Sequence, residues 1–185
     1  CSLVGSEMCI RDRDDVQGIG IGVPGPVDSQ GVVHRCVNLG WGVVNVAEEL
    51  GNLTGLKIKV GNDANVAALG EMWQGGAKGS KDVIMVTLGT GVGGGIIVDG
   101  KVVAGFNGAG GEIGHITVNN DEIEACNCGQ YGCLEQYTSA TGIVRLAKRK
   151  LAKSTEETSI REIPNLTAKD VFDAAKAGDA IAIGL

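Results

Sequence analysis

The sequence has 185 residues, 43% of them hydrophobic, and a formal net charge of −6. That length and apolar content suffice for a buried core in one domain or two small ones, and the negative charge argues against a nucleic-acid-binding surface. No run of eighteen apolar residues occurs, so we expect no membrane-spanning segment. The 31 glycines against three prolines indicate many tight turns and close backbone approaches.

Both ends of the sequence are abrupt. Residues 1–13, CSLVGSEMCIRDR, have no initiator methionine and lack the charged and apolar regions of a signal peptide. They resemble translated adapter sequence, so we expect this tail to be non-native. The last apolar run stops at Leu185, and we expect the chain to be incomplete at both ends.

Strands and helices alternate along the first part of the chain. Residues 16–23 alternate apolar side chains with glycine, which predicts a buried strand packed closely against another backbone. Further along, the patterns predict a turn at 24–28, a polar loop at 32–41, a helix at 46–53, a strand at 57–60 and a helix that starts directly after Gly61.

Asn62 and Asp63 lie at the junction of that last strand and helix. Taken alone, the pair has a structural interpretation, in which Asn62 caps the helix and Asp63 is a first-turn acid facing the helix dipole. The pair also lies at the carboxyl end of a strand, where ligands of α/β folds bind. Both roles are compatible with each other.

A glycine-rich turn separates two apolar strands. Asp82–Leu88 is a near-continuous apolar run that predicts a buried strand, and Gly89–Gly95 has glycine at five of seven positions. The glycines lead into a second strand and an Asp99–Gly100 hairpin turn, which rules against a Rossmann dinucleotide site and a P-loop. Bare backbone N–H groups in such a turn favour phosphate binding. An ordinary glycine-rich hairpin is the alternative.

Three cysteines, Cys126, Cys128 and Cys133, fall within eight residues, and His115 lies eleven residues upstream. The glycines and small residues between them allow the thiolates to converge on one point. Three cysteines and one histidine make a closed, structural zinc site with no open position for hydrolysis. Buried free thiols or a disulfide are the alternatives. Scattered placement of the other cysteines suits a reducing cytoplasm better than a disulfide framework.

The C-terminal part is predicted to be helical. We expect a helix from Leu134 to about Lys153, then an exposed polar linker over 154–164. An amphipathic helix over 168–177 follows. Its apolar side is expected to carry Val171, Phe172 and Ala175. In the helix expected from Leu134 to about Lys153, the basic residues predict a solvated face. These residues are Arg145, Lys148, Arg149 and Lys150.

Five motifs together resemble the ROK family of sugar kinases and related repressors. In the family's order they are Val37–Trp41, Gly61–Asn65, Leu88–Gly95, Gly111–His115 and Cys126–Glu135. The resemblance covers roughly Val16 to the C-terminus and, within the family, is greatest to the bacterial glucokinases. One family motif, Asp-x-Gly-Gly-Thr on the first hairpin, does not occur in this chain.

The resemblance implies an α/β fold of the actin-like ATPase, ribonuclease H-like class with two lobes. Residues 14–75 would form the end of the N-terminal lobe and residues 76–185 much of the C-terminal lobe. The implied activity is ATP-dependent phosphorylation of glucose at the 6-hydroxyl, with Mg²⁺ on the phosphates. Without the first hairpin motif, we expect the fragment itself to be inactive.

The family motifs also imply roles for individual residues. Asp63 would be the catalytic base, and a zinc ion on His115, Cys126, Cys128 and Cys133 would fix the segments that carry the sugar-binding acids. One ring nitrogen of His115 would bind the metal while the other faces the sugar. The sugar would be held by Asn38, Asn62, Asp63, Glu112, His115 and Glu135, and the ATP phosphates by Gly89, Thr90, Gly91 and Gly93.

Two other classes of protein remain open at this point. A sugar-responsive repressor would share these motifs behind a DNA-binding segment, and a zinc-stabilised binding module would lack catalysis. Among kinases, fructose, N-acetylmannosamine or N-acetylglucosamine are alternatives to glucose. The resemblance further implies a cytoplasmic homodimer or homotetramer.

Overall fold

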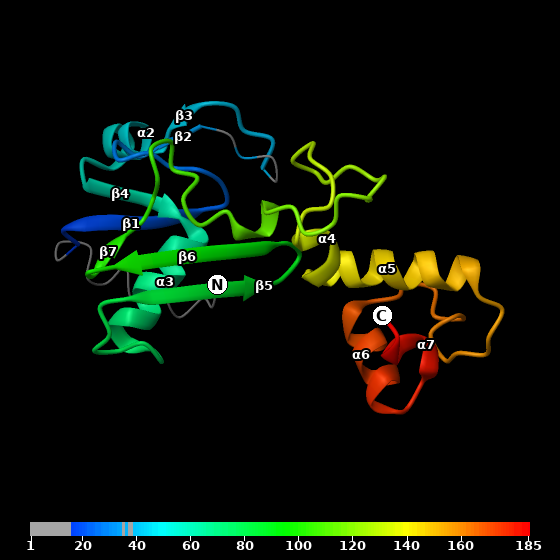
Figure 1. The fold of residues 1–185 in the computed structure, drawn as a ribbon. Coiled ribbons are helices and arrows are strands. Elements are labelled where there is room, and N and C mark those ends of the chain that lie inside the picture. The colour runs from blue at the N-terminus through cyan, green and yellow to red at the C-terminus, as the bar shows by residue number, and fades with distance from the viewer. Residues whose placement is uncertain (1–15, 35, 37–38) are drawn as a thin grey trace. The chain divides into compact units, whose positions relative to one another are not determined.

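The computed structural model describes residues 16–34, 36 and 39–185 (Figure 1). The expected non-native tail at 1–13 and the predicted sugar ligand Asn38 lie outside the described residues. The chain divides into two compact units, Cys1–Met85 with Gly95–Gly111, and Val86–Gly94 with Glu112–Leu185. No helix in the described part of the chain combines the length and the apolar character needed to cross a membrane.

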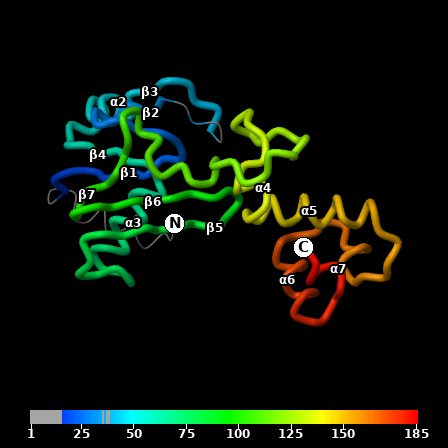
Figure 2. The backbone as a smooth tube through the Cα atoms, viewed as in Figure 1, coloured from blue at the N-terminus to red at the C-terminus, as the bar shows by residue number. Residues whose placement is uncertain are grey.

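The first unit is built on two parallel strands, β1 (Gly18–Val23) and β4 (Lys57–Asn62), which lie side by side in Figures 1 and 2. The chain between them forms β2 (Val32–Val33), antiparallel to β3 (Val44–Asn45), and helix α2 (Val46–Thr54). The short strand β2 therefore replaces part of the expected loop. Helix α2 ends at Gly55 in the left-handed region, which glycine adopts without a Cβ penalty.

The core of this unit consists of small apolar side chains from these elements. Gly18 permits the close approach predicted from the glycine pattern, since a Cβ there would lie 2.8 Å from Lys57 O. The prediction that β1 is buried was wrong except at Val23, because most of its other residues are exposed. The buried cluster is Val23, Val27, Val33, Cys36 and Val46.

A three-stranded sheet has the order β5 (Val83–Leu88), β6 (Val92–Val98) and β7 (Lys101–Val102). The predicted hairpin turn joins β6 to β7, and its residues Asp99 and Gly100 have φ values of 51° and 73°. Burial of β5 was predicted wrongly on one face. One face of β5 is left uncovered, so its alternate side chains reach the surface, where Ile84, Val86 and Leu88 are 49 to 75% exposed.

Helices dominate the second unit. After the 3-10 turn η3 (Ile113–His115) come α4 (Glu135–Thr138), α5 (Ala140–Lys153), α6 (Ala168–Lys176) and α7 (Ala180–Ile183). The single helix expected from Leu134 to Lys153 was wrong, because the chain is extended at Ser139, which caps α5 by accepting from Gly142 N. Gly142 allows the two helices to approach, since a Cβ there would lie 2.5 Å from Glu135 O.

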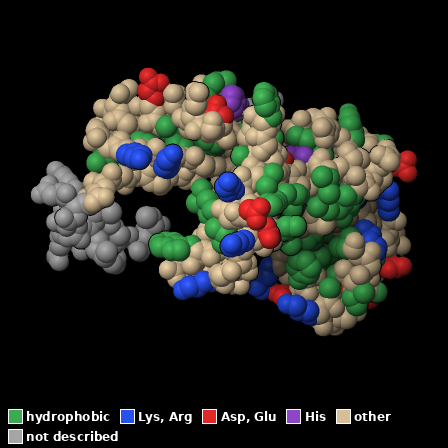
Figure 3. Space-filling model, turned by 60° about the vertical axis from the view of Figure 1, so that its left-hand side comes forward, with side chains coloured by type: hydrophobic (Ala, Val, Ile, Leu, Met, Phe, Trp, Pro, Cys, Tyr) green, Lys and Arg blue, Asp and Glu red, His purple; other side chains and the backbone are tan. Residues whose placement is uncertain are grey.

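Helices α6 and α7 pack against α5 (Figure 2). The expected exposed linker over 154–164 was wrong at Ile160, which is only 1% exposed and belongs to this core. On α6 the buried side chains are Val171 and Ala174, whereas Phe172 is 52% exposed. Figure 3 shows groups of apolar side chains at the surface. Basic and acidic side chains lie between them.

Candidate functional site

Asn62 ends β4 and caps helix α3 (Asp63–Gln74). Its side-chain oxygen accepts hydrogen bonds from Ala64 N at 3.0 Å and Asn65 N at 3.2 Å, and its Nδ2 donates to Gly25 O at 3.2 Å. The predicted capping role is therefore confirmed. The side chain also links the Pro24–Asp28 turn to the start of α3. The sugar-binding role of Asn62 stays a prediction.

Asp63 is the first residue of α3 and is exposed. Its Oδ1 accepts from Ala64 N at 2.8 Å. Among the described residues, no hydrogen bond is made to Oδ2. The carboxylate therefore lies at the carboxyl end of a parallel strand with one oxygen available to a ligand.

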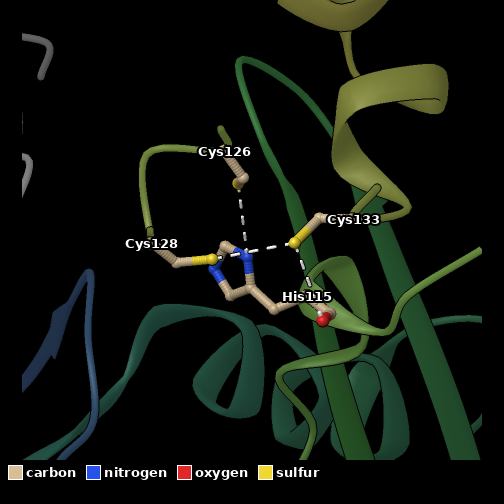
Figure 4. Close-up of side chains that lie close together, drawn as sticks. All are labelled: His115, Cys126, Cys128 and Cys133. Atoms are coloured by element: carbon tan, nitrogen blue, oxygen red, sulfur yellow. Dashed lines mark hydrogen bonds between the residues drawn. The ribbon is translucent and has the colours of Figure 1, made fainter. Parts of the chain in front are cut away.

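The second unit brings His115, Cys126, Cys128 and Cys133 together, as the spacing predicted (Figure 4). We call these four residues the Cys–His cluster. Their ligand atoms all lie within 4.8 Å of one another. Cys128 Sγ is 3.7 Å from Cys133 Sγ, and Cys126 Sγ is 3.8 Å from His115 Nδ1. Burial raises the pKa values of the Cys126 and Cys133 thiols.

The Cys–His cluster fits a zinc ion by both donor type and spacing. Tetrahedral zinc with Zn–S bonds of about 2.3 Å separates neighbouring ligand atoms by about 3.6 to 3.8 Å. The Cys128–Cys133 and Cys126–His115 separations match this edge length, and the 4.8 Å limit shows a cluster slightly wider than a filled site. Three thiols and one imidazole are the donors that zinc prefers in closed structural sites.

Glu135, the first residue of α4, lies between the Cys–His cluster and the glycine-rich turn. Its Oε1 accepts from Cys126 Sγ at 3.1 Å and lies 3.9 Å from His115 Nδ1. Its Oε2 accepts from Val92 N at 3.4 Å. Glu135 also lies close to Gly91, since a Cβ at that position would lie 2.8 Å from Glu135 Oε2.

The predicted phosphate-binding residues lie in the turn between β5 and β6 and at the start of β6. They are Gly89, Thr90, Gly91 and Gly93, and we call Gly89–Gly93 the glycine turn. Gly89 N donates to Gly91 O at 3.0 Å. The segment that carries Glu112 and His115 lies against the start of β6, since a Cβ on Gly114 would lie 2.2 Å from Val92 O. The second unit therefore gathers the glycine turn, Glu112, Glu135 and the Cys–His cluster.

A buried ion-pair network around Glu122 was not predicted. Its side chain is 1% exposed and accepts from Arg145 Nη2 at 3.0 Å, from Arg149 Nη1 at 2.9 Å and from Tyr137 Oη at 2.7 Å. The hydrogen bond from Arg145 holds the pKa of Glu122 well below its usual range. The prediction that Arg145 and Arg149 lie on a solvated face was wrong, because both arginines neutralise this carboxylate.

This network supports the loop that carries the cysteines. Gln136 is buried, accepts from Cys133 N at 3.0 Å and donates to Glu124 O at 3.0 Å. Asn119 donates to Tyr137 Oη at 2.9 Å. The polypeptide from Asn119 to Cys133 is thus held on α4 and α5 by buried polar contacts, in addition to any metal.

Comparison with known proteins shows what the chain is similar to. The ROK family model matches residues 7–185. A glucokinase of Halalkalibacterium halodurans is 45% identical over 179 residues, which are 95% of this chain and 54% of the relative. The crystal structure of a ROK family glucokinase from Streptomyces griseus in complex with glucose and AMPPNP has 34% identity and a TM-score of 0.76, covering 99% of this chain and 63% of that one.

A third relative is a regulator. The crystal structure of a ROK family transcriptional regulator, a homologue of the E. coli MLC protein, has 28% identity and a TM-score of 0.82, covering 98% of this chain and 46% of that one. The fold is therefore the mixed α/β fold of the actin-like ATPase class. The chain belongs to the ROK family. It spans about half the length of the curated glucokinase that it matches.

Proposed function

We propose that this chain is part of a hexose kinase that transfers the γ-phosphoryl group of ATP to the 6-hydroxyl of glucose. The observation that carries the proposal is the exposed Asp63 carboxylate at the end of β4, with one oxygen available to a ligand. The similarity to the glucokinase of Halalkalibacterium halodurans and to the glucokinase solved with glucose and AMPPNP supports this choice of substrates.

In the proposed reaction, Asp63 accepts the proton of the sugar hydroxyl as the oxygen attacks the γ-phosphorus. The bond from phosphorus to the sugar oxygen forms, and the bond to the β-phosphate oxygen breaks, which gives glucose 6-phosphate and ADP. Backbone N–H groups of the glycine turn hold the phosphate oxygens, and Mg²⁺ would offset their charge.

Glucose would be held by hydrogen bonds to polar side chains. Carboxylates suit this role because two adjacent sugar hydroxyls can donate to one carboxylate. His115 would use Nδ1 in the Cys–His cluster, which leaves Nε2 for a hydroxyl. The proposed sugar ligands are Asn38, Asn62, Asp63, Glu112, His115 and Glu135.

We propose that the Cys–His cluster holds one structural Zn²⁺ through His115, Cys126, Cys128 and Cys133. Such an ion would supply cross-linking of the loop, because no ligand position is left open for a substrate. The contacts of Glu135 with Cys126 and His115 support a link between this loop and the sugar-binding acids. Free thiols favour a reducing compartment, so we propose a cytoplasmic location. From the membership in the ROK family we propose a homodimer or homotetramer.

A sugar-responsive regulator is the second candidate, and one observation favours it. The solved ROK family transcriptional regulator has a TM-score of 0.82 with this chain, above the 0.76 of the solved glucokinase. A regulator needs to bind sugar but not to transfer phosphate, so turnover distinguishes the two functions.

The test is a coupled assay of ADP release with glucose, fructose, N-acetylmannosamine and N-acetylglucosamine. It uses the 185-residue chain and a chimera that takes the remaining length from the Halalkalibacterium halodurans glucokinase. We expect the chimera to turn over glucose fastest. Sugar binding without turnover by the chimera on any of the four sugars would favour the regulator.

A further inference from the structure

We infer that Thr141 is a positioning residue that orients the backbone N–H groups of the glycine turn for phosphate. This inference rests on the proposed function of that turn. Thr141 is the second residue of α5, and its hydroxyl Oγ1 donates to the carbonyl oxygen of Thr90 at 2.7 Å. The two residues are 51 positions apart in the sequence, so the contact is a feature of the fold.

A second hydrogen bond acts on the neighbouring peptide. Ala140 N donates to Gly89 O at 2.9 Å. The segment Ser139–Thr141, which we call the α4–α5 corner, therefore draws two successive carbonyl groups of the glycine turn toward itself. Ser139 holds the corner in place, since it is 1% exposed, donates to Glu135 O at 2.6 Å and accepts from Gly142 N at 2.9 Å.

The direction of the N–H groups follows from peptide geometry. In a planar trans peptide, the C=O and the N–H of the same unit point in opposite directions, and no described residue has a cis peptide bond. With the carbonyls of Gly89 and Thr90 turned toward the α4–α5 corner, the N–H groups of Thr90 and Gly91 point away from it.

Those two N–H groups have no acceptor among the described residues; Thr90 is exposed and Gly91 is partly exposed. Glycine peptides are otherwise free to rotate, because glycine adopts positive and negative φ about equally. Hydrogen bonds from outside the glycine turn are therefore needed to fix the direction of its N–H donors. Donors that are already fixed bind an anion without reorganisation cost. Of the two contacts, only the one from Thr141 comes from a side chain.

The experiment measures binding of magnesium tripolyphosphate and Mg·ATP to the full 185-residue chain by titration calorimetry. Tripolyphosphate has no adenine and so reports on the glycine turn itself. Thr141→Val removes the hydroxyl at nearly constant volume, and Thr141→Ser keeps it. Thr138→Val is the matched control, because that hydroxyl donates to Leu134 O within the same segment and does not touch the glycine turn.

We expect Thr141→Val to weaken both ligands about three- to tenfold and to lower the melting temperature by about 4 °C at most, since the lost hydrogen bond to Thr90 O lies within the protein. Thr141→Ser and Thr138→Val should bind like the wild type. Equal binding by Thr141→Val, or equal weakening by Thr141→Ser, would overturn the role of the hydroxyl while leaving the proposed function intact. A wild-type chain that binds neither ligand would overturn phosphate binding by the glycine turn and, with it, the role of Thr141, whereas turnover by the chimera tests the proposed function separately.

Discussion

Asn62 Nδ2 donates to the carbonyl oxygen of Gly25 at 3.2 Å, so the residue before the proposed base is fixed to the turn that follows β1. The same side chain caps α3 through its oxygen. Because Asp63 is the next residue, both contacts determine where its carboxylate stands.

Two substitutions of Asn62 distinguish the contribution of the cap from that of the hydrogen bond to Gly25. Asn62→Ala removes both, and we expect a loss of about 1 to 3 kcal/mol in the free energy of unfolding. Asn62→Asp keeps a capping oxygen and loses the donor to Gly25, so its loss should be smaller. Urea denaturation measures both losses, with Asn45→Ala, which removes a half-buried cap on α2, as the control. Equal stability of the Asn62→Ala variant and the wild type would show that neither contact stabilises the fold.

Glu122 should matter far more for stability than its neighbour Glu124. Glu122→Gln leaves the guanidinium groups of Arg145 and Arg149 without their buried carboxylate, and we expect a loss of about 2 kcal/mol or more. Glu124→Gln breaks only a half-exposed pair with Arg145 and should cost about 0 to 1 kcal/mol. Thermal unfolding of the two variants tests the difference, and similar losses would argue against the network.

The stabilisation by Glu122 should also depend on pH. The pKa of this carboxyl is lowered in the folded protein by the hydrogen bond from Arg145, whereas an unfolded glutamate has a pKa of about 4.3. The unfolded state therefore binds the proton first as pH falls, so the contribution is complete above about pH 5 and declines below about pH 4. The gap in stability between wild type and Glu122→Gln should narrow over that acidic range. A gap that stays constant down to about pH 3 would contradict a lowered pKa as its cause.

The Cys–His cluster predicts one zinc ion per chain. Cys128→Ser and Cys133→Ser should each lower the zinc content after dialysis to well below one per chain, and a chelator should lower the melting temperature of the wild type but not of these two variants. Cys36→Ala is the control and should respond to the chelator like the wild type, because Cys36 is buried in the core of the first unit and lies outside the Cys–His cluster. Elemental analysis measures the outcome; full zinc content in the Cys133→Ser variant would exclude this ligand set.

Local patterns were enough to predict several parts of the structure. The cap at Asn62 depends on residues two and three positions away, and the convergence of three cysteines with His115 follows from spacing and glycine content. In both cases the controlling contacts lie close in sequence, so the residues themselves carry the information.

Other features depend on contacts between residues far apart in the sequence, which the periodicity of apolar residues does not indicate. The break at Ser139 accompanies the close approach of Gly142 to Glu135 O, and Arg145 meets Glu122 across 23 positions. Ile160 lies in a polar segment but enters the core of α5, α6 and α7. The apolar pattern of β5 indicates a capacity for burial, whereas actual burial depends on whether another element covers each face.

The measurement that tests the central claim most directly is the rate of glucose phosphorylation by the Asp63→Asn chimera beside the wild-type chimera. Asparagine has the shape of aspartate but cannot accept the proton, so we expect kcat to fall at least about 100-fold while glucose affinity stays within about threefold. Glu49→Gln, an exposed first-turn acid on α2, is the matched control and should be fully active. Turnover by Asp63→Asn at the wild-type rate would contradict the assignment of Asp63 as the base.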